Sequence, residues 1–188
     1  MPREPRHEVP GGYFHVSTRG VNGDAIFFSA HDRVVFLTWL ARTTEQYDWL
    51  CIAYCLMGNQ YHLVIQTPEP TLARGMQFLN GGFAQATNHR YEREGHLFGR
   101  RYWCELLETE AHLLETSRYV VLNPVRARIC DTPAAWPWSS YRATLGLVPA
   151  PSFLALDVQL CILTPVRTAA RDAYYAFVED GRMRIEQR

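Results

Sequence analysis

The residues best placed to do chemistry lie in the stretch 51–68, where Gln60 and His62 are two positions apart. Two apolar runs flank Gly58-Asn59, a pattern that predicts two strands joined by a tight turn. Because side chains alternate along a strand, Gln60 and His62 would project from the same face. Such a pair can aim two ligands at one point, but it also fits a solvent-facing strand with an isolated histidine. Other parts of the sequence are needed to decide between a ligand pair and a solvent-facing strand.

A second candidate set lies on a predicted helix over residues 110–122. At the α-helical step of about 100° per residue, Leu114 and Val121 fall on one side. Tyr119 and Asn123 are four positions apart and fall together on the opposite side. The helix therefore offers a phenol hydroxyl and an amide away from its main apolar stripe.

Asn123 has an alternative role because it precedes Pro124. Asparagine as a cap, with proline at the first helical position, is a common helix start. Asn123 could therefore cap a short following helix, act as a ligand, or do both.

The elements that would position these side chains follow from the sequence periodicity. Aromatic and β-branched residues predict a strand over 12–19, and Ser29 can cap a helix that runs to about Tyr47. A helix over 72–86 and a strand over 102–107 follow the hairpin. This order indicates an α+β fold, a ferredoxin-like antiparallel four-stranded sheet packed with helices, in which the first and third strands are central.

The carboxyl-terminal part is expected to form a helical tail. We predict that residues 1–147 form one domain and that 148–188 form a tail, which packs on the domain or extends it. Residues 131–147 are aromatic and loop-like, and a final helix is expected over 166–183.

Composition sets broad limits on function. The chain has 188 residues, of which 19 are basic and 19 acidic, so its net charge does not favour binding to nucleic acid. The sequence contains no Lys, so all 19 of these basic residues are Arg, a side chain suited to phosphates and base edges. The five cysteines form no C-x-x-C pair, which favours a reducing compartment. No stretch has the pattern of a membrane span or a signal peptide, so we expect a cytoplasmic protein.

The segment 89–101 mixes charge and aromatic residues. It carries four Arg against two Glu, with aromatic side chains between them. Such a segment can hold phosphates and stack bases, or it can be a solvated loop.

Four separated stretches occur in a fixed order: YCLMGNQYHLV at 54–64, GHLFGRRY at 95–102, RYVVLNPVRA at 118–127 and WPWSSY at 136–141. Together they resemble the REP-associated tyrosine transposases, relatives of the single-tyrosine HUH transposases. The resemblance runs from about residue 12 to 146, and residues 176–181 also resemble the family's tail.

The resemblance implies a catalytic domain that acts on single-stranded DNA, often next to a hairpin. We expect the protein to be a monomer or homodimer. The resemblance implies that Tyr119 is the nucleophile that forms a 5′-phosphotyrosine bond. It also implies a divalent metal, Mg²⁺ or Mn²⁺, held by His62, Asn123 and the residue at position 60. Five arginines are then candidate phosphate contacts: Arg100, Arg101, Arg126, Arg128 and Arg142.

The chain departs from the family pattern at Gln60, where the family has the first histidine of the pair, and at Gly58, where it usually has proline. A Gln oxygen is neutral and a poorer donor than imidazole for softer metals. The balanced net charge is also unusual for such a relative. Two further functions therefore stay open: a catalytically weakened, domesticated protein that binds hairpin DNA, and a small α+β protein that binds RNA or another protein.

Overall fold

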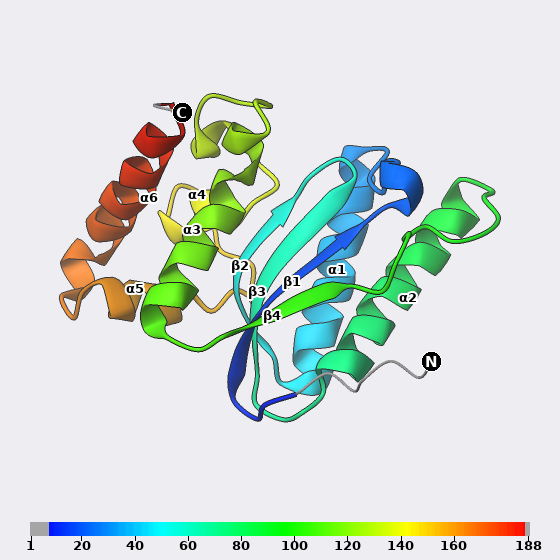
Figure 1. Ribbon diagram of the computed structural model, residues 1–188, viewed down its shortest axis with the longest axis horizontal. Helices are drawn as coiled ribbons and strands as arrows, with labels where there is room; N and C mark the ends of the chain where they lie inside the picture. The colour runs from blue at the N-terminus through cyan, green and yellow to red at the C-terminus, as the bar shows by residue number, and fades with distance from the viewer. Residues whose placement is uncertain (1–7, 187–188) are drawn as a thin grey trace.

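Four antiparallel strands form the centre of the computed structural model, which describes residues 8–186 (Figure 1). They are β1 (Gly12–Arg19), β2 (Leu50–Leu56), β3 (Gln60–Thr67) and β4 (Trp103–Leu107). The strand order is β2-β3-β1-β4, so β1 and β3 are central. This arrangement confirms the expected ferredoxin-like α+β fold, including its carboxyl-terminal helix.

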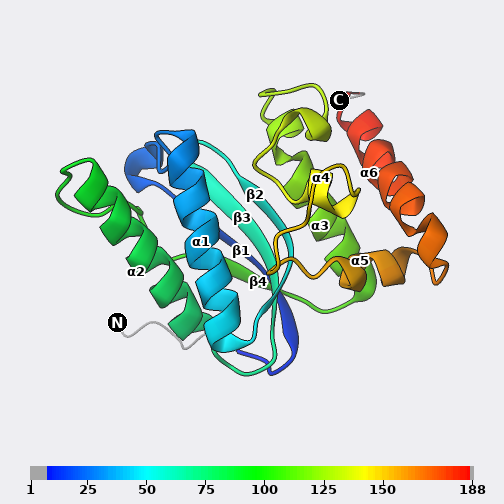
Figure 2. The same cartoon turned by 180° about the vertical axis from the view of Figure 1, so that it is seen from behind.

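Helices cover both faces of the sheet. Figure 1 and Figure 2 show α1 (Ala30–Tyr47) and α2 (Leu72–Arg90) on one side, and α3 (Glu110–Arg126) on the other. Both central strands are therefore buried between helical layers, and their alternating side chains supply two different cores.

Alternation along the central strands separates the large core from the candidate site. Phe14 and Val16 of β1 pack with Tyr61 and Leu63 of β3 in the cluster that includes α1 and α2. The intervening residues face the other way, and Val64 packs there with residues of α3. His62 consequently lies on the α3 face of the sheet.

Local signals fix the start of α1 as the sequence predicts. The Ser29 hydroxyl accepts a hydrogen bond from the backbone N–H of Asp32, and the Asp32 carboxylate accepts one from the backbone N–H of Ser29 at 2.7 Å. This reciprocal capping satisfies N–H groups that the first turn leaves unpaired.

The turn between β2 and β3 is tied to the segment after β1. Neither Gly58 nor Asn59 has a positive φ. The Gly58 carbonyl accepts hydrogen bonds from the backbone N–H groups of Ile26 and Phe27, and the Asn59 amide donates to the Gly23 carbonyl. These bonds hold the beginning of β3, and hence Gln60, against the end of β1.

Close approach of α1 and α2 depends on a glycine. A Cβ at Gly82 would lie 2.5 Å from the ring of Trp39, whereas one at Gly81 would meet no atom within 4 Å. The Gly-Gly pair, which weakens the helix pattern in the sequence, therefore contains one glycine that the packing requires and one that it does not.

The carboxyl-terminal region adds short elements and one long helix. The expected aromatic loop over 131–147 contains two short helices, and the later part contains two more helices and a 3-10 turn. These elements are η2 (Pro133–Ala135), α4 (Tyr141–Thr144), α5 (Leu156–Leu163), η3 (Arg167–Ala169) and α6 (Ala170–Glu186). Helix α6 packs on α3 through a separate apolar cluster that includes Val121, Leu122, Tyr174 and Val178. Within residues 8–186, no helix is both long and apolar enough to cross a membrane.

Candidate active site

Two histidines from the two central strands meet on the α3 face. The register pairs Ser17 of β1 with His62 of β3, and His15 with Val64, so the two histidines are diagonal neighbours. The Nε2 atom of His15 lies 3.1 Å from the Nδ1 atom of His62. Both side chains are buried, with 6% and 7% of their surface exposed.

Burial keeps both rings neutral near pH 7. Desolvation by burial is the main cause that lowers the pKa of His15 to about 4, and the nearby His112 has a smaller effect in the same direction. Desolvation by burial is also the main cause that lowers the pKa of His62 to about 3, and the neighbouring His15 has a smaller effect. The Nε2 atom of His62 is buried and has no hydrogen-bond partner among residues 8–186. A neutral imidazole keeps one nitrogen lone pair, as a metal ligand requires.

Tyr119 reaches the two histidines from α3. Its ring centroid lies 6.0 Å from that of His15 and 5.9 Å from that of His62, and 38% of the residue is exposed. The three side chains line a cavity of about 350 Å³, which we call the tyrosine cavity. Its lining residues are His15, Ser17, His62, Trp103, Glu105, Thr116 and Tyr119.

A second cavity lies beside Tyr119 and is rich in arginine. The guanidinium of Arg126 lies 5.2 Å from the Tyr119 ring centroid. Arg126 and Arg128 line this cavity of about 470 Å³ together with Arg118 and Arg184, and we call it the arginine cavity. Arg118 is already engaged, because it donates to Asp180 and to the Phe177 carbonyl of α6.

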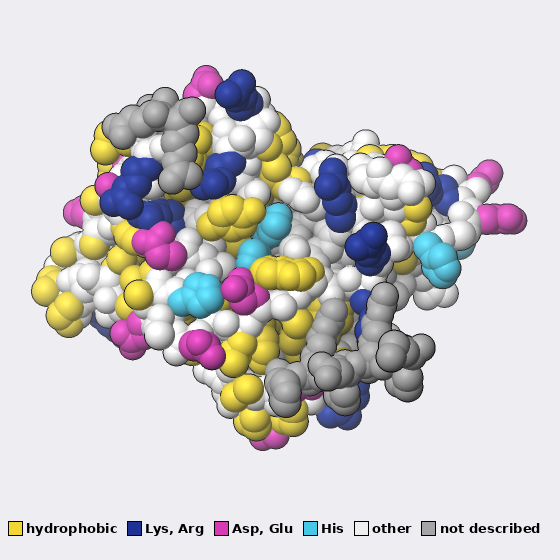
Figure 3. Space-filling model, in the orientation of Figure 1, with side chains coloured by type: hydrophobic (Ala, Val, Ile, Leu, Met, Phe, Trp, Pro, Cys, Tyr) yellow, Lys and Arg dark blue, Asp and Glu magenta, His cyan; other side chains and the backbone are white. Residues whose placement is uncertain are grey.

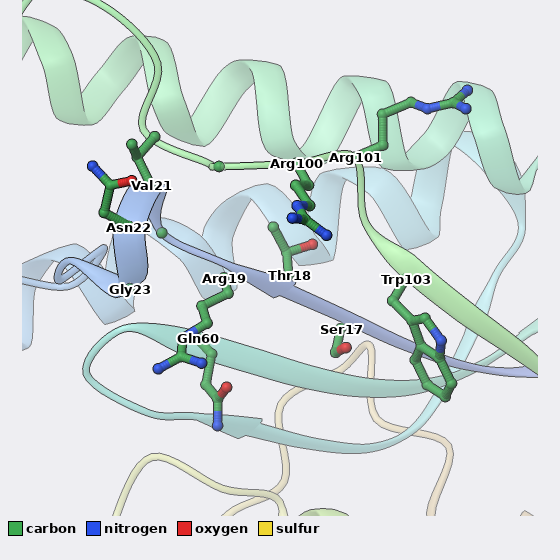
Figure 4. Close-up of a pocket in the computed structure, with 12 residues that line it drawn as sticks. Ser17, Thr18, Arg19, Val21, Asn22, Gly23, Gln60, Arg100, Arg101 and Trp103 are labelled. Atoms are coloured by element: carbon green, nitrogen blue, oxygen red, sulfur yellow. The ribbon is translucent and has the colours of Figure 1, made fainter. Parts of the chain in front are cut away.

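Gln60 lines a neighbouring groove rather than the tyrosine cavity. Figure 4 shows it beside Arg19, its pairing partner on β1. This groove of about 640 Å³, which we call the strand groove, is also lined by Arg100 and Arg101. Ser17 and Trp103 line both the strand groove and the tyrosine cavity, so the two are adjacent.

Asn123 lies inside α3 instead of capping another helix. The helix continues to Arg126, and the Asn123 carbonyl accepts a hydrogen bond from the backbone N–H of Ala127. The capping alternative is therefore wrong. The Asn123 amide donates to the Tyr119 carbonyl at 3.1 Å and is buried, so it does not share the exposure of Tyr119.

The expected single apolar stripe of α3 is replaced by two buried sides. Val120 packs toward the sheet, and Val121 packs toward α6. Leu114, which the periodicity placed in the main stripe, is only partly buried. The helix is sandwiched, and Tyr119 marks the side that stays open.

The structure thus distributes the predicted site residues over several places. Tyr119 and His62 share the tyrosine cavity, Gln60, Arg100 and Arg101 line the strand groove, and Arg126 and Arg128 line the arginine cavity. Asn123 and Arg142 line none of the three, and Arg142 lies in α4. In Figure 3, histidines gather with hydrophobic side chains near the middle of this face, and arginines lie on either side.

The sequence pattern does not single out His15, Trp103 or Thr116, which line the tyrosine cavity. The alternation of β1 could have placed His15 on the face of Ser17, but its approach to His62 needs the register between β1 and β3.

A metal at this site could draw on histidine and amide donors, and on Glu105, the carboxylate that lines the tyrosine cavity. Within residues 8–186, no group of three or more His, Cys, Asp or Glu side chains is arranged to hold a metal ion. The unpartnered Nε2 atom of His62 suits a divalent cation. Gln60, on the same face of β3, and Asn123, one helical turn from Tyr119, are the amide donors on the adjoining elements.

Fold and site together define a ferredoxin-like α+β protein in which a helix-borne tyrosine faces two histidines on the central strands. No family model matches the chain. It is 26% identical over 111 residues to a protein of Haemophilus influenzae that is provisionally described as a REP-associated tyrosine transposase. The match covers 53% of this chain and 63% of the length of that relative.

A solved structure of a REP-associated tyrosine transposase bound to a REP hairpin has the same fold. The TM-score is 0.67 at 14% identity, and the match covers 84% of this chain and 93% of that chain. The predicted resemblance to REP-associated tyrosine transposases is confirmed by these comparisons.

Proposed function

We propose that this protein cleaves and rejoins single-stranded DNA next to hairpins, with Tyr119 as the nucleophile. The observation that carries the proposal is that Tyr119 and His62 line one cavity, which adjoins an arginine-lined groove. The similarity to REP-associated tyrosine transposases, one of which is bound to a REP hairpin, supports the choice of substrate.

In the proposed step, the Tyr119 oxygen attacks the phosphorus of a phosphodiester. The bond from phosphorus to the 3′ oxygen breaks, the phenol loses its proton, and the departing 3′ oxygen gains one. The products are a 5′-phosphotyrosine bond and a free 3′ hydroxyl. Because the phosphodiester bond energy is conserved, a 3′ hydroxyl can later reverse the attack and rejoin a strand.

The residues around Tyr119 suit a phosphate. The Arg126 guanidinium lies over the Tyr119 ring, where it can hold a phosphate that approaches the hydroxyl. Trp103 is 50% exposed at the junction of the strand groove and the tyrosine cavity, and an exposed indole can stack on a base. Arg19, Arg100 and Arg101 would contact the backbone of a strand that lies in the groove.

We propose that His62, Asn123 and Gln60 hold a divalent cation, Mg²⁺ or Mn²⁺. Such a cation polarises a phosphate and neutralises the charge that develops on it. His62 supplies the only imidazole of this set, and imidazole is the commonest metal ligand among protein side chains, so affinity for Mn²⁺ should be weaker than for a pair of histidines.

A second candidate function is hairpin binding without strand transfer. The observation that favours it is that Gln60 both replaces the family's first histidine and lines the strand groove instead of the tyrosine cavity. In this alternative the protein is a domesticated relative that still recognises DNA.

The test is incubation of the protein with an end-labelled single strand that contains a hairpin, with Mn²⁺ or Mg²⁺, followed by a denaturing gel. We expect a covalent protein–DNA band that Tyr119→Phe abolishes. Tyr175→Phe is the matched control, because Tyr175 is an exposed tyrosine on α6 and lines none of the three cavities. A shift of the same DNA on a native gel without any covalent band would favour the second function.

A further inference from the structure

We propose that His15 is a positioning residue that holds His62 in the tautomer with its hydrogen on Nδ1. The Nε2 atom of His62 then carries a lone pair available to a divalent cation. The metal part of this inference rests on the proposed function, whereas the tautomer is a property of the chain alone.

The contact between the two rings permits two arrangements. The His15 Nε2 atom and the His62 Nδ1 atom are 3.1 Å apart, a hydrogen-bond distance with room for one hydrogen between them. If His15 donates that hydrogen, a neutral His62 must carry its own hydrogen on Nε2. If His62 donates it, the Nε2 atom of His62 keeps a lone pair.

Burial decides between these arrangements. The Nε2 atom of His62 is buried and has no partner within the described residues. An N–H group at that place would be a buried donor without an acceptor, which is unfavourable. The structure therefore favours donation from His62 Nδ1 to His15 Nε2, with the second hydrogen on Nδ1 of His15.

His15 is well fixed for this role. It lies on central strand β1, and its ring meets Trp103 edge-on with centroids 5.1 Å apart. The Tyr119 ring lies at 6.0 Å on another side. A metal-bound histidine usually donates its second N–H to an acceptor that fixes the tautomer, and His15 supplies such an acceptor for His62.

The first readout is the tautomer of His62 in the metal-free protein, from long-range ¹⁵N–¹H correlation spectra of histidine-labelled protein. We expect the hydrogen on Nδ1 in the wild type and its loss from that position in His15→Leu. His15→Gln places an amide oxygen where the Nε2 acceptor was, so it should restore the wild-type tautomer.

The second readout is the affinity for Mn²⁺, measured by the electron paramagnetic resonance of free Mn²⁺. We expect His15→Leu to weaken binding about tenfold or more, the size of effect that outer-shell partners of ligands have. His15→Gln should recover most of the affinity. His31→Leu is the matched control, because His31 is an exposed residue of α1 and lines none of the three cavities.

Three results would overturn the role of His15. They are a hydrogen on Nε2 of His62 in the wild type, unchanged Mn²⁺ affinity in His15→Leu, and a shift of the His15 Nε2 resonance that shows direct ligation of Zn²⁺, used as a diamagnetic probe. A wild type that binds no Mn²⁺ would instead overturn the metal part of the proposed function. The tautomer of His62, read without metal, would still decide whether His15 holds that ring.

Discussion

Neighbouring residues of β3 face different surroundings. His62 lies under α3 near Tyr119, while Gln60, two positions earlier on the same face, lines the strand groove beside Arg19. The pleat of the strand keeps the two side chains parallel. They are far enough apart along the strand that each lines a different cavity. Position 60 can therefore affect metal binding, DNA binding or both.

Gln60→His should separate these effects. An imidazole at position 60 restores a two-histidine pair, and neutral imidazole is the commonest metal ligand among protein side chains. We expect Mn²⁺ affinity to rise about tenfold, or about 1.4 kcal/mol, with an increase in covalent adduct at limiting Mn²⁺. Calorimetric titration with Mn²⁺ and the denaturing gel measure the two quantities.

Gln66→His is the control for this substitution. Gln66 is on the same face of β3 but at its opposite end, opposite Tyr13. The extra imidazole there should leave Mn²⁺ affinity unchanged. If Gln60→His instead weakens hairpin binding and leaves Mn²⁺ affinity as it was, residue 60 is a DNA contact and not a ligand.

The sequence identified the residues whose neighbours are local or whose motif is distinctive. The alternation of the hairpin predicts that His62 and Gln60 share one face of the strand, and the motif around Tyr119 singles out a tyrosine that lines the tyrosine cavity. Its role as the nucleophile stays a proposal. The position of His15 beside His62 could not be predicted, because a lone histidine in a strand does not indicate its cross-strand neighbour. Its contact with His62 depends on a register that only the folded sheet defines.

At the scale of the elements, the carboxyl-terminal end of helix α3 could not be predicted from the sequence. Pro124 predicts an end near residue 122, because proline cannot donate to the preceding turn. The helix nevertheless continues to Arg126, with Pro124 buried inside it. Packing on both sides, against the sheet and against α6, outweighs the loss of one hydrogen bond. Such packing has no local signature in the sequence.

Helix α2 offers a direct test of packing against helix propensity. Gly82→Ala adds a Cβ that would lie 2.5 Å from the Trp39 ring, so it should lower the free energy of unfolding by about 1–3 kcal/mol. Gly81→Ala places the same group in open space and should raise it by about 0.5–1 kcal/mol. Urea denaturation measures both. Equal effects of the two substitutions would contradict the close approach of α1 to α2.

The attachment of α6 to α3 depends on Arg118. This buried guanidinium donates to the Phe177 carbonyl and to Asp180, and it lies 4.4 Å from the Phe177 ring centroid. We expect Arg118→Ala to cost about 2–3 kcal/mol in urea denaturation, because charged hydrogen bonds and the ring contact are lost together.

Arg184→Ala is the comparison for that measurement. Arg184 pairs with the same Asp180 at 2.9 Å, but its side chain is 67% exposed. Exposed ion pairs contribute little, so the cost should stay below about 0.5 kcal/mol. Similar losses for both arginines would mean that Asp180, and not the buried position of Arg118, determines the attachment.

Across the whole molecule, a balanced total hides an uneven distribution of charge. The 19 basic and 19 acidic residues cancel, and the total alone argues against a nucleic-acid partner. The strand groove, however, is lined by three arginines and by no acidic side chain. The arginine cavity is lined by four arginines and one acidic residue, Glu115, and Asp180 pairs with two of these arginines, Arg118 and Arg184. Local charge, which a count over the sequence cannot show, is what a DNA strand would meet.

The salt dependence of hairpin binding should report this local charge. Each arginine that neutralises a phosphate releases a counterion, so the slope of log affinity against log salt should be steep despite the zero net charge. Arg100→Gln and Arg101→Gln should each weaken binding and reduce the magnitude of the slope by about 0.7–0.9. Arg142→Gln is the informative comparison, because Arg142 is a sequence-based candidate that lines none of the three cavities. Fluorescence anisotropy over a salt series measures the slopes. An unchanged slope for the groove arginines, with a reduced one for Arg142→Gln, would move the DNA path from the strand groove to the surface of α4.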